Sequence, residues 1–297
     1  MLKLILKYAF IACICMLFGI NDAMSQEKIH SIKTLPRNYL IKVKQFSEFI
    51  DRFNYQKDFL NKDIGAEFKS IITRNDYILL LFNHEDKRLD PEFEDDTYQI
   101  LVNMFIREIC SDSIYIDRLS ENIYAELTCK INLDGKDEEI NMLLRREFDN
   151  GLKWAIVSVD HRFDRGMVNQ QNESDDAGAD DTMNYIPPYS NETNFIDLKS
   201  LFNDHESLNN LSSRDCVKEN LAGFYEMIRR GSLKYQHVKS IHYHILDIPG
   251  WIIVISNFQR NADNSGWLVS DLFLTDDISD YFTDKYAYML PGIFLSK

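Results

Sequence analysis

Apolar and polar positions form two similar stretches, each built like a pair of strands joined by a polar turn. The stretch from Trp251 to Thr275 has a weaker echo between Glu139 and Phe163. Each copy has a turn rich in Asn and Gly, then a Trp, then apolar residues, then Ser and Asp: Asn150, Gly151, Trp154, Ser158 and Asp160 in the first, and Asn264, Gly266, Trp267, Ser270 and Asp271 in the second. Internal repeats reveal how a chain is organised, so the echo predicts two related units. The alternative is a chance match, since any hairpin needs such a turn.

The first half of the chain predicts helices followed by strands. A helix over 45–60 is predicted by apolar residues at helical spacing, which are Phe46, Phe49, Ile50, Phe53 and Leu60. Residues 68–82 fit either a short helix or a helix followed by a strand over 77–82. A stronger helix is predicted over 96–110, where Asp95 or Asp96 can accept hydrogen bonds from the first free amides.

A three-stranded meander follows these helices. Residues from Ile123 to Ile131 alternate between apolar and polar, which is the period of a strand with one wet face. Asp134-Gly135 predicts a tight hairpin turn. Strands over 140–148 and 154–163 complete the meander.

The second half repeats this order in a shorter form. Ser212 or Ser213 is the expected cap of its main helix, with Asp215 at a capping-box spacing from Ser212. The buried face of that helix is expected to hold Val217, Leu221, Phe224, Tyr225 and Ile228. The predicted elements are a short helix over 195–202, the main helix ended by Gly231, strands over 233–247, 251–258 and 267–274, a short helix over 276–285, and an apolar tail over 286–294 that packs on the body. The strand over 251–258 is apolar on both faces and should lie inside its sheet.

This order of helices and long antiparallel strands resembles the NTF2-like fold, a cystatin-like α+β cone. The resemblance implies two tandem NTF2-like units, each with helices packed on a curved antiparallel sheet. Residues 45–163 carry it best, and residues 195–275 look like a trimmed copy. The chain is also similar in style to exported proteins of the Bacteroidetes.

The start of the chain predicts a cleaved signal peptide over residues 1–25. Lys3 and Lys7 give a positive start, the run from Tyr8 to Ile20 is apolar, and Ala23-Met24-Ser25 supplies small residues for cleavage before Gln26. The apolar run is shorter than the ~20 residues of a membrane-spanning helix. A lipoprotein with lipidated Cys13 is a less favoured alternative, because a Lys interrupts the short run before it. We therefore expect an exported protein, either periplasmic or on or beyond the cell surface.

Three further segments are predicted after cleavage: a first α+β domain over 26–163, an acidic linker over 164–194, and a second, shorter α+β domain over 195–297. The linker is too polar to bury a core of its own. Its cluster from Asp175 to Asp181 could suggest a calcium loop, but it lacks the ligand spacing and the terminal Glu of an EF-hand. We interpret it as a solvated tether.

Charge and composition narrow the class of partner. The 297 residues include 47 acidic and 33 basic side chains, which gives a formal net charge of −14. Such a surface repels phosphate backbones and anionic lipid headgroups, so a nucleic-acid partner is disfavoured. We expect no integral membrane segment after signal removal. A protein, peptide or glycan partner fits these properties, as does a homo-oligomer.

The cysteines and histidines do not predict a metal centre. Cys110, Cys129 and Cys216 remain after cleavage, and buried apolar roles are favoured over a bond between Cys110 and Cys129. His242 and His244 share a strand face, as metal ligands can, but no third ligand is positioned by the sequence. In a regular strand His237 would lie on the opposite face. We therefore expect no bound metal and no cofactor.

Other candidate residues follow from the resemblance and from the echo. NTF2-like isomerases and dehydratases use an acid, His or Tyr inside the cone, which implies Tyr124, Tyr243, Asp160 and Asp271 as pocket residues. The matching Trp154 and Trp267 could be stacking platforms for a sugar or peptide, although core positions are favoured.

The sequence contains no nucleophile elbow, phosphate loop, HExxH or CxxC pair. We therefore assign no catalytic, cofactor-binding or metal-binding residue. The predicted function is an exported, non-catalytic binding or assembly module. The alternative is an NTF2-like acid–base enzyme, of the isomerase or dehydratase type, that acts on a small molecule in one cone.

Overall fold

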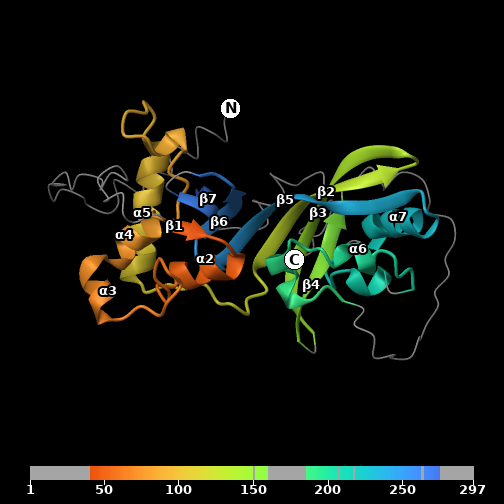
Figure 1. Ribbon diagram of the computed structural model, residues 1–297, viewed down its shortest axis with the longest axis horizontal. Coiled ribbons are helices and arrows are strands. Elements are labelled where there is room, and N and C mark those ends of the chain that lie inside the picture. The colour runs from red at the N-terminus through yellow and green to blue at the C-terminus, as the bar shows by residue number, and fades with distance from the viewer. Residues whose placement is uncertain are drawn as a thin grey trace. The chain divides into compact units, whose positions relative to one another are not determined.

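The described residues form an α+β fold in which helices pack on a mixed sheet of seven strands, which confirms the α+β part of the predicted fold class. Figure 1 shows the computed structural model, which describes residues 41–149, 151–159, 185–206, 208–216, 218–261 and 264–274. The strands lie in the order β1-β7-β6-β5-β2-β3-β4. Their bounds are β1 Ile41–Val43, β2 Ile123–Leu133, β3 Lys136–Phe148, β4 Leu152–Val159, β5 Leu233–Ile248, β6 Trp251–Phe258 and β7 Asn264–Leu274.

Two antiparallel meanders, β2-β3-β4 and β5-β6-β7, make up most of this sheet. They join where β2 pairs antiparallel with β5, from Ile123 opposite Ile245 to Leu133 opposite Leu233. The strands of both predicted domains therefore belong to one sheet. The strand β1 adds to the edge of β7 in parallel.

The helices are mostly short. The α-helices are α2 Phe46–Phe53, α3 Ala66–Ile71, α4 Arg74–Leu79, α5 Thr97–Ser111, α6 Leu198–Leu201 and α7 Lys218–Arg229, and the 3₁₀ helices include η2 Lys87–Leu89, η4 Pro188–Thr193 and η5 Leu208–Leu211. None of the described helices combines the length and the apolar character needed to cross a membrane.

Each half of the chain supplies helices that cover strands of the other half (Figure 1). The helix α2 lies against β7, and the ring centroid of Phe105 on α5 is 5.2 Å from that of Trp251 on β6. The Trp251 indole also donates a hydrogen bond of 3.0 Å to Glu108. The helix α7 packs on β4 as well as β5. Segments distant in sequence thus bury one another's apolar faces.

Tyr243 on β5 lies at the centre of the core and is fully buried. Its ring stacks on Phe46 at 3.9 Å, and its centroid lies 6.3 Å from that of Trp154 and 4.9 Å from that of Trp267. The matching tryptophans of the two meanders therefore converge on one residue. With exposures of 1% and 3%, Trp154 and Trp267 are core residues rather than stacking platforms.

The helix predicted over 45–60 ends early, at Phe53. Asn54 stops it because its side-chain amide donates to the Ile116 carbonyl at 2.9 Å and its side-chain oxygen accepts from the Ile116 amide at 2.8 Å. Leu60, which we expected on the buried face, is 74% exposed. The four apolar residues within α2 are buried as predicted.

Residues 68–82 form part of α3 and all of α4, so of the two alternatives the one with a strand over 77–82 is wrong. Thr73 starts α4, because its hydroxyl accepts from the Asp76 amide. What remains of the strand is a single bridge between Phe82 and Val269.

Three other local predictions hold. The helix α5 matches the prediction over 96–110, with Asp95 accepting from the Thr97 amide at 3.0 Å. Asp134 and Gly135 both have positive φ, as the tight hairpin requires. Six of the eight residues of β6 are buried, and β6 lies between β7 and β5. Residues 160–163, Val217 and the predicted elements over 276–294 lie outside the described residues.

Two segments outside the predicted helices and strands are packed against the sheet edges. Residues 41–43 form β1, and Ile186 pairs with Trp154 at the edge of β4. The Trp154 indole donates to the Pro188 carbonyl at 3.2 Å. Residues 185–194 are therefore part of the folded body, because they satisfy an otherwise open strand edge. Residues 164–184, including the predicted calcium loop, lie outside the described residues.

The residues of the capping box expected before α7 bind other partners instead. The hydroxyl of Ser212 bonds to Tyr225, and that of Ser213 donates to Glu147. Asp215 forms an ion pair with Arg145. Gly231 ends α7 with φ +73°, as predicted.

Candidate functional site

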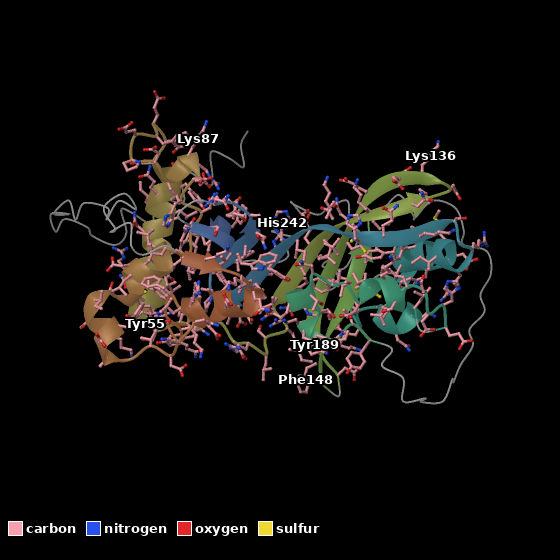
Figure 2. All side chains as sticks on the ribbon, viewed as in Figure 1. Tyr55, Lys87, Lys136, Phe148, Tyr189 and His242 are labelled. Atoms are coloured by element: carbon pink, nitrogen blue, oxygen red, sulfur yellow. The ribbon has the colours of Figure 1, made fainter. Side chains whose placement is uncertain are left out.

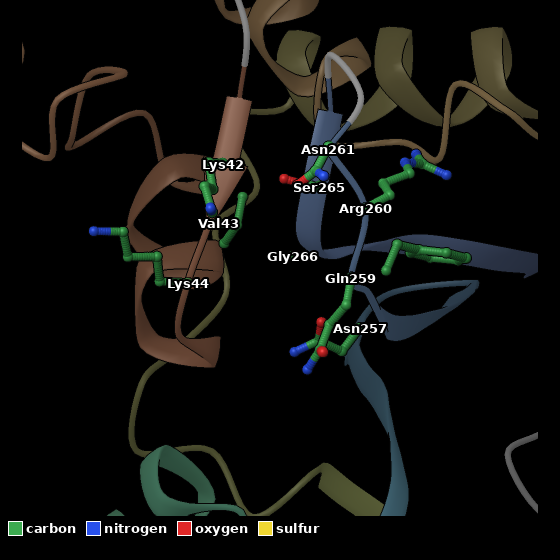
Figure 3. A pocket seen from close by; sticks show the side chains of 10 residues that line it. Lys42, Val43, Lys44, Asn257, Gln259, Arg260, Asn261, Ser265 and Gly266 are labelled. Atoms are coloured by element: carbon green, nitrogen blue, oxygen red, sulfur yellow. The ribbon is translucent and has the colours of Figure 1, made fainter.

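A polar pocket lies where β1 meets the turn between β6 and β7 (Figure 3). It has a volume of about 490 Å³, within the range of ligand sites in proteins. Its ten described lining residues are Lys42, Val43, Lys44, Asn257, Phe258, Gln259, Arg260, Asn261, Ser265 and Gly266. None of them is an Asp or a Glu, which is unusual for a chain with this excess of acidic residues.

The floor of the pocket depends on a close approach between two backbones. Lys42 pairs with Ser265 and Val43 with Gly266, in parallel register. Gly266 has φ +88°, and a Cβ at this position would overlap the Val43 carbonyl. Glycine is therefore required where β1 crosses the start of β7.

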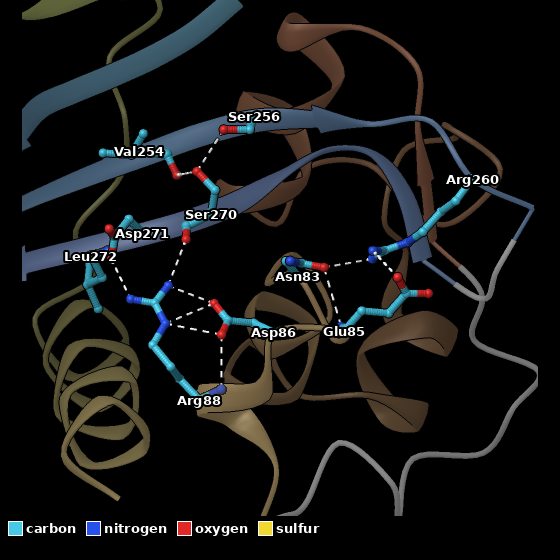
Figure 4. Close-up of polar contacts among 10 residues, drawn as sticks. All are labelled: Asn83, Glu85, Asp86, Arg88, Val254, Ser256, Arg260, Ser270, Asp271 and Leu272. Atoms are coloured by element: carbon cyan, nitrogen blue, oxygen red, sulfur yellow. Dashed lines mark hydrogen bonds and ion pairs between the residues drawn. The ribbon is translucent and has the colours of Figure 1, made fainter. Parts of the chain in front are cut away.

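Arg260 lines the pocket but is already committed to holding the turn (Figure 4). Its guanidinium donates to both the carbonyl and the side-chain oxygen of Asn264, and to the Asn83 side chain at 2.8 Å. It also pairs with Glu85 at 2.8 Å. Asn264 in turn donates to the carbonyls of Leu80 and Phe82. The turn is thus a fixed wall of the pocket.

A second arginine fixes the edge of β7 nearby (Figure 4). Arg88 on η2 pairs with Asp86, bonds to Asp271 at 3.1 Å and to the Ser270 carbonyl at 3.1 Å, and lies over the Tyr98 ring. Burial favours the neutral form of Asp86, but hydrogen bonds from Arg88 outweigh it and lower the pKa of that carboxyl. Those hydrogen bonds likewise raise the pKa of Arg88. Asp271 is therefore a structural partner rather than a pocket acid.

The remaining polar side chains of the pocket can meet a ligand. Lys42, Lys44, Asn257, Gln259 and Asn261 are exposed, and their side chains form no hydrogen bond or ion pair within the described part of the chain. Ammonium groups bind carboxylates and sulfates, and amides both donate to and accept from hydroxyls. The pocket therefore suits an anionic ligand rich in hydroxyl groups.

The histidine pair lies on the sheet face opposite Tyr243. The Nδ1 of His242 is 2.7 Å from the Ser256 hydroxyl, and the Nε2 of the buried His244 is 3.3 Å from the Glu126 carboxylate. No group of three metal-binding side chains occurs among the described residues. Irregular pairing between β2 and β5 brings His237 opposite Lys130, on the face of His242. Our expectation of the opposite face, which assumed a regular strand, is wrong.

The three described candidates among those implied by the resemblance do not share a pocket. Tyr124 pairs with His244 and so lies on the outer face, whereas Tyr243 faces the core. Asp271 is held by Arg88, and Asp160 lies outside the described residues. No converging acid, base and tyrosine constellation forms from this set.

One polar cluster inside the core was not predicted. Arg146 is 6% exposed, and its guanidinium lies over the rings of Phe46 and Trp154. Burial lowers its pKa to about 10, opposed by the charges of Tyr243 and Glu192. Arg146 Nε and Glu192 Oε2 are buried without a hydrogen-bond partner in the described structure. Local sequence patterns could not reveal this cluster, because its members come from β3, η4 and β5.

The described cysteines are free thiols. Cys129 is buried beside Met142, with 3.7 Å between their sulfurs, and burial raises the pKa of its thiol to about 12. Burial also raises the pKa of Cys110. Cys129 is thus a small apolar core residue, as predicted.

The pocket itself was missed by sequence reasoning. A turn was predicted over 261–266, and the polar run from Asn257 to Asn261 was visible, but β1 was not. Comparison with known proteins adds no relative from which a site could be inferred: no family model, curated protein or solved structure matches the chain.

Proposed function

We propose that this protein is an exported, non-catalytic binding module that takes an acidic oligosaccharide in the pocket between β1 and the β6–β7 turn. One observation carries the proposal: lysines and amides line the pocket and none of its described lining residues is a carboxylate, in a chain whose formal net charge is −14. Elsewhere, excess negative charge repels an anionic ligand, so electrostatics favours this pocket over the rest of the surface.

The chemistry of the lining favours a sugar acid over a simple anion. Lys42 and Lys44 can bind carboxylate or sulfate groups, while Asn257, Gln259 and Asn261 can bond neighbouring hydroxyls. An acidic peptide would meet the lysines but leave most of the amides without matched partners. Five of the lining residues are exposed, so the pocket can be reached from the surface, which suits one end or one edge of a longer chain.

The filled core supports a non-catalytic role. The interior where an NTF2-like cone would hold substrate contains Tyr243, whose ring contacts those of Phe46, Trp154 and Trp267. The proposal includes an NTF2-like origin by duplication. It is supported by two meanders, each preceded by a helix, whose matching tryptophans meet at Tyr243. The expected signal peptide, with lipidation at Cys13 as the alternative, would bring the protein to the compartment where such glycans occur.

Binding by the mature chain, residues 26–297, tests the proposal. Calorimetry would compare trigalacturonate with a neutral trisaccharide of the same length, and then extend to sulfated and sialylated oligomers. We expect the double variant Lys42→Glu/Lys44→Glu to weaken binding of the acidic ligand at least tenfold, which is about 1.4 kcal/mol. Raising the salt concentration should weaken it as well.

A matched control replaces two lysines with glutamates at surface positions outside the pocket. Lys87 and Lys136 are exposed and lie far apart on the surface, and neither lines the pocket (Figure 2). We expect the variant Lys87→Glu/Lys136→Glu to bind within twofold of wild type. Equal binding of acidic and neutral sugars, equal loss in the two double variants, or binding of an acidic peptide instead of every sugar would contradict the proposal.

The acid–base enzyme is a second candidate, favoured by the buried cluster of Arg146, Glu192 and Tyr243. It requires a small molecule to enter the core, and NMR screening with a fragment library tests this. Loss of fragment binding in Tyr243→Phe but not in Lys42→Glu/Lys44→Glu would favour the enzyme. Loss in the lysine variant alone would favour the binding module.

A further inference from the structure

The first half of β5, from Leu233 to Ile241, has a neighbouring strand on one side only, within the described residues. On that side, β2 pairs with it along its whole length. On the other side, β6 pairs with β5 only from His242 to Ile248 and then continues beside β7. Figure 1 accordingly shows the first half of β5 extending past β6 and lying beside α7. Main-chain groups along such an open edge can pair with a further strand.

Side chains along this edge are accessible. Lys234, His237 and Lys239 are exposed, and Tyr235 and Val238 are partly buried. Within the described part of the chain, β2 is the only main-chain partner of residues 234–241. A strand that pairs with the edge would therefore displace no described segment. The edge is also separate from the proposed sugar site, because it contributes none of the described lining residues of that pocket.

The outer side of this edge is basic. Residues 233–246 contain no Asp or Glu, although the chain has 47 acidic residues. Lys234 and His237 share the outer face, and neither forms an ion pair with a described residue. Lys239 pairs with Glu139 of β3 at 2.8 Å. Two copies of this edge would bring lysines together and repel one another, whereas acidic side chains on an added strand would be attracted.

The inner side of the same edge offers apolar contact. Tyr235 and Val238 pair with Ile131 and Cys129, which are fully buried, so they lie on the helix-covered face of the sheet. The ring of Tyr235 lies 5.2 Å from that of Phe202, between centroids. Since Tyr235 and Val238 are only partly buried, apolar side chains of an added strand would remove more of their surface from water.

We propose that residues 233–241 bind an extended segment of a partner protein in which acidic and apolar residues alternate. The main chain of that segment would add a strand beside β5. Because side chains alternate between the two faces of a strand, its acidic residues would lie on the side of Lys234 and its apolar residues on the side of Tyr235. The partner is thus recognised by its main chain and by the alternation of its side chains.

Two bulges and the lysines make this edge selective. The register leaves Gln236 and Lys239 without an opposite residue on β2, which bends β5 at these points. Bulges and lysines are devices that keep exposed edges from pairing with copies of the same chain. Regular pairing with a partner is therefore short, about 5–6 residues as in an average strand. A long neutral strand and a second copy are both disfavoured.

Peptide binding to the full mature chain, residues 26–297, tests the proposal. Calorimetry compares a short peptide of alternating glutamate and valine with peptides in which lysine or serine replaces every glutamate. We expect the acidic peptide to bind at least about tenfold more tightly than either. N-methylation of its central residues should weaken its binding by a similar factor, because these residues can then no longer donate main-chain hydrogen bonds.

Two further measurements locate the bound peptide. Amide hydrogen exchange followed by mass spectrometry should slow in residues 233–241 when the acidic peptide binds, because a new strand protects main-chain amides there. Lys234→Glu should weaken binding at least about threefold. The matched control is Lys69→Glu, which makes the same charge change at an exposed position on α3 and should leave the affinity unchanged.

Several outcomes would overturn the proposal. They are no binding of the acidic peptide, equal binding of the acidic and basic peptides, an equal loss in Lys234→Glu and Lys69→Glu, and slower exchange in 41–44 and 257–266 in place of 233–241. A dimer in which 233–241 is protected would mean that a second copy occupies the edge. Lys42→Glu/Lys44→Glu should bind the peptide as wild type does, which separates this edge from sugar binding.

Discussion

The turns of the two meanders begin from similar sequences and have different surroundings. Asn150-Gly151 precedes Trp154, and Asn264-Ser265-Gly266 precedes Trp267. Both tryptophans reach the same core residue, Tyr243. Yet Gly151 has nothing near its Cβ position, whereas Gly266 lies against the Val43 carbonyl.

This difference separates features that depend on the sequence of a strand from features that depend on the segments packed around it. The alternating pattern of each strand places one Trp in the core, whatever the turn does. The pocket exists only at the second turn, because β1 and the contacts of Arg260 enclose it there. The proposed binding site therefore depends on the second turn alone.

The largest expected effect is at the point where the two meanders meet. Tyr243→Ala removes a fully buried ring that contacts Phe46, Trp154 and Trp267, and should lower the free energy of unfolding by about 3–5 kcal/mol. Urea denaturation followed by tryptophan fluorescence and by far-UV circular dichroism measures it. Because both meanders share one sheet, the two signals should change together in wild type and variant.

Phe148→Ala is the control for that measurement. Its side chain is 59% exposed, so unfolding should change by less than about 0.5 kcal/mol. Two separate transitions in the wild-type chain would show that the two halves fold independently. The shared core at Tyr243 would then not couple their unfolding.

The two turn glycines give the next effect and test the comparison directly. Gly266→Ala meets the Val43 carbonyl and a positive φ together, so we expect a loss of about 3 kcal/mol. Gly151→Ala meets only the unfavourable φ of +145°, so about 1 kcal/mol is expected. Urea denaturation of both variants measures the difference, and equal losses would mean that β1 does not hold the second turn.

Local patterns predicted the strands, turns and long helix because each depends on neighbouring residues. The hairpin at Asp134-Gly135, the doubly buried β6 and the helix α5 are of this kind. The end of α2 was missed because Asn54 stops the helix by bonding to Ile116, far along the chain. The predicted helix extended to Leu60 because the prediction used only the spacing of apolar residues.

Local sequence patterns also could not predict which distant segments pair with each other. Nothing in β2 or β5 alone indicates that they pair, and a three-residue strand such as β1 has too few positions to show a period. The pocket joins β1 to a turn near the other end of the described chain. It could not be predicted before that pairing was known, although its polar turn residues were visible.

The smallest expected effect is electrostatic and compares two places on the sheet, one beside β7 and one on β3. Asp86 near the edge of β7 and Glu139 on β3 both have lowered pKa values. Burial alone would raise the pKa of Asp86, but hydrogen bonds from Arg88 outweigh it. At Glu139 a hydrogen bond from Lys239 lowers the pKa. The lowered pKa of Asp86 stabilises the folded protein at pH values above 3.8, the ordinary pKa of an Asp side chain. This contribution disappears as the pH falls through the lowered pKa. Asp86→Asn should therefore cost about 0.5–1 kcal/mol at pH 6, reduced by solvent screening, and nearly nothing at pH 2.

Glu139→Gln is the matched variant for this last measurement. The carboxyl of Glu139 is exposed, so solvent screens its pair with Lys239 and no resolvable change is expected at either pH. Urea denaturation of wild type and both variants at pH 6 and pH 2 provides the test. A cost for Asp86→Asn that stays constant or grows toward pH 2 would mean that the carboxylate charge does not stabilise the β7 edge. Arg88 would then hold that edge through Asp271 and the Ser270 carbonyl alone, and the second turn would owe its rigidity to Arg260 and β1.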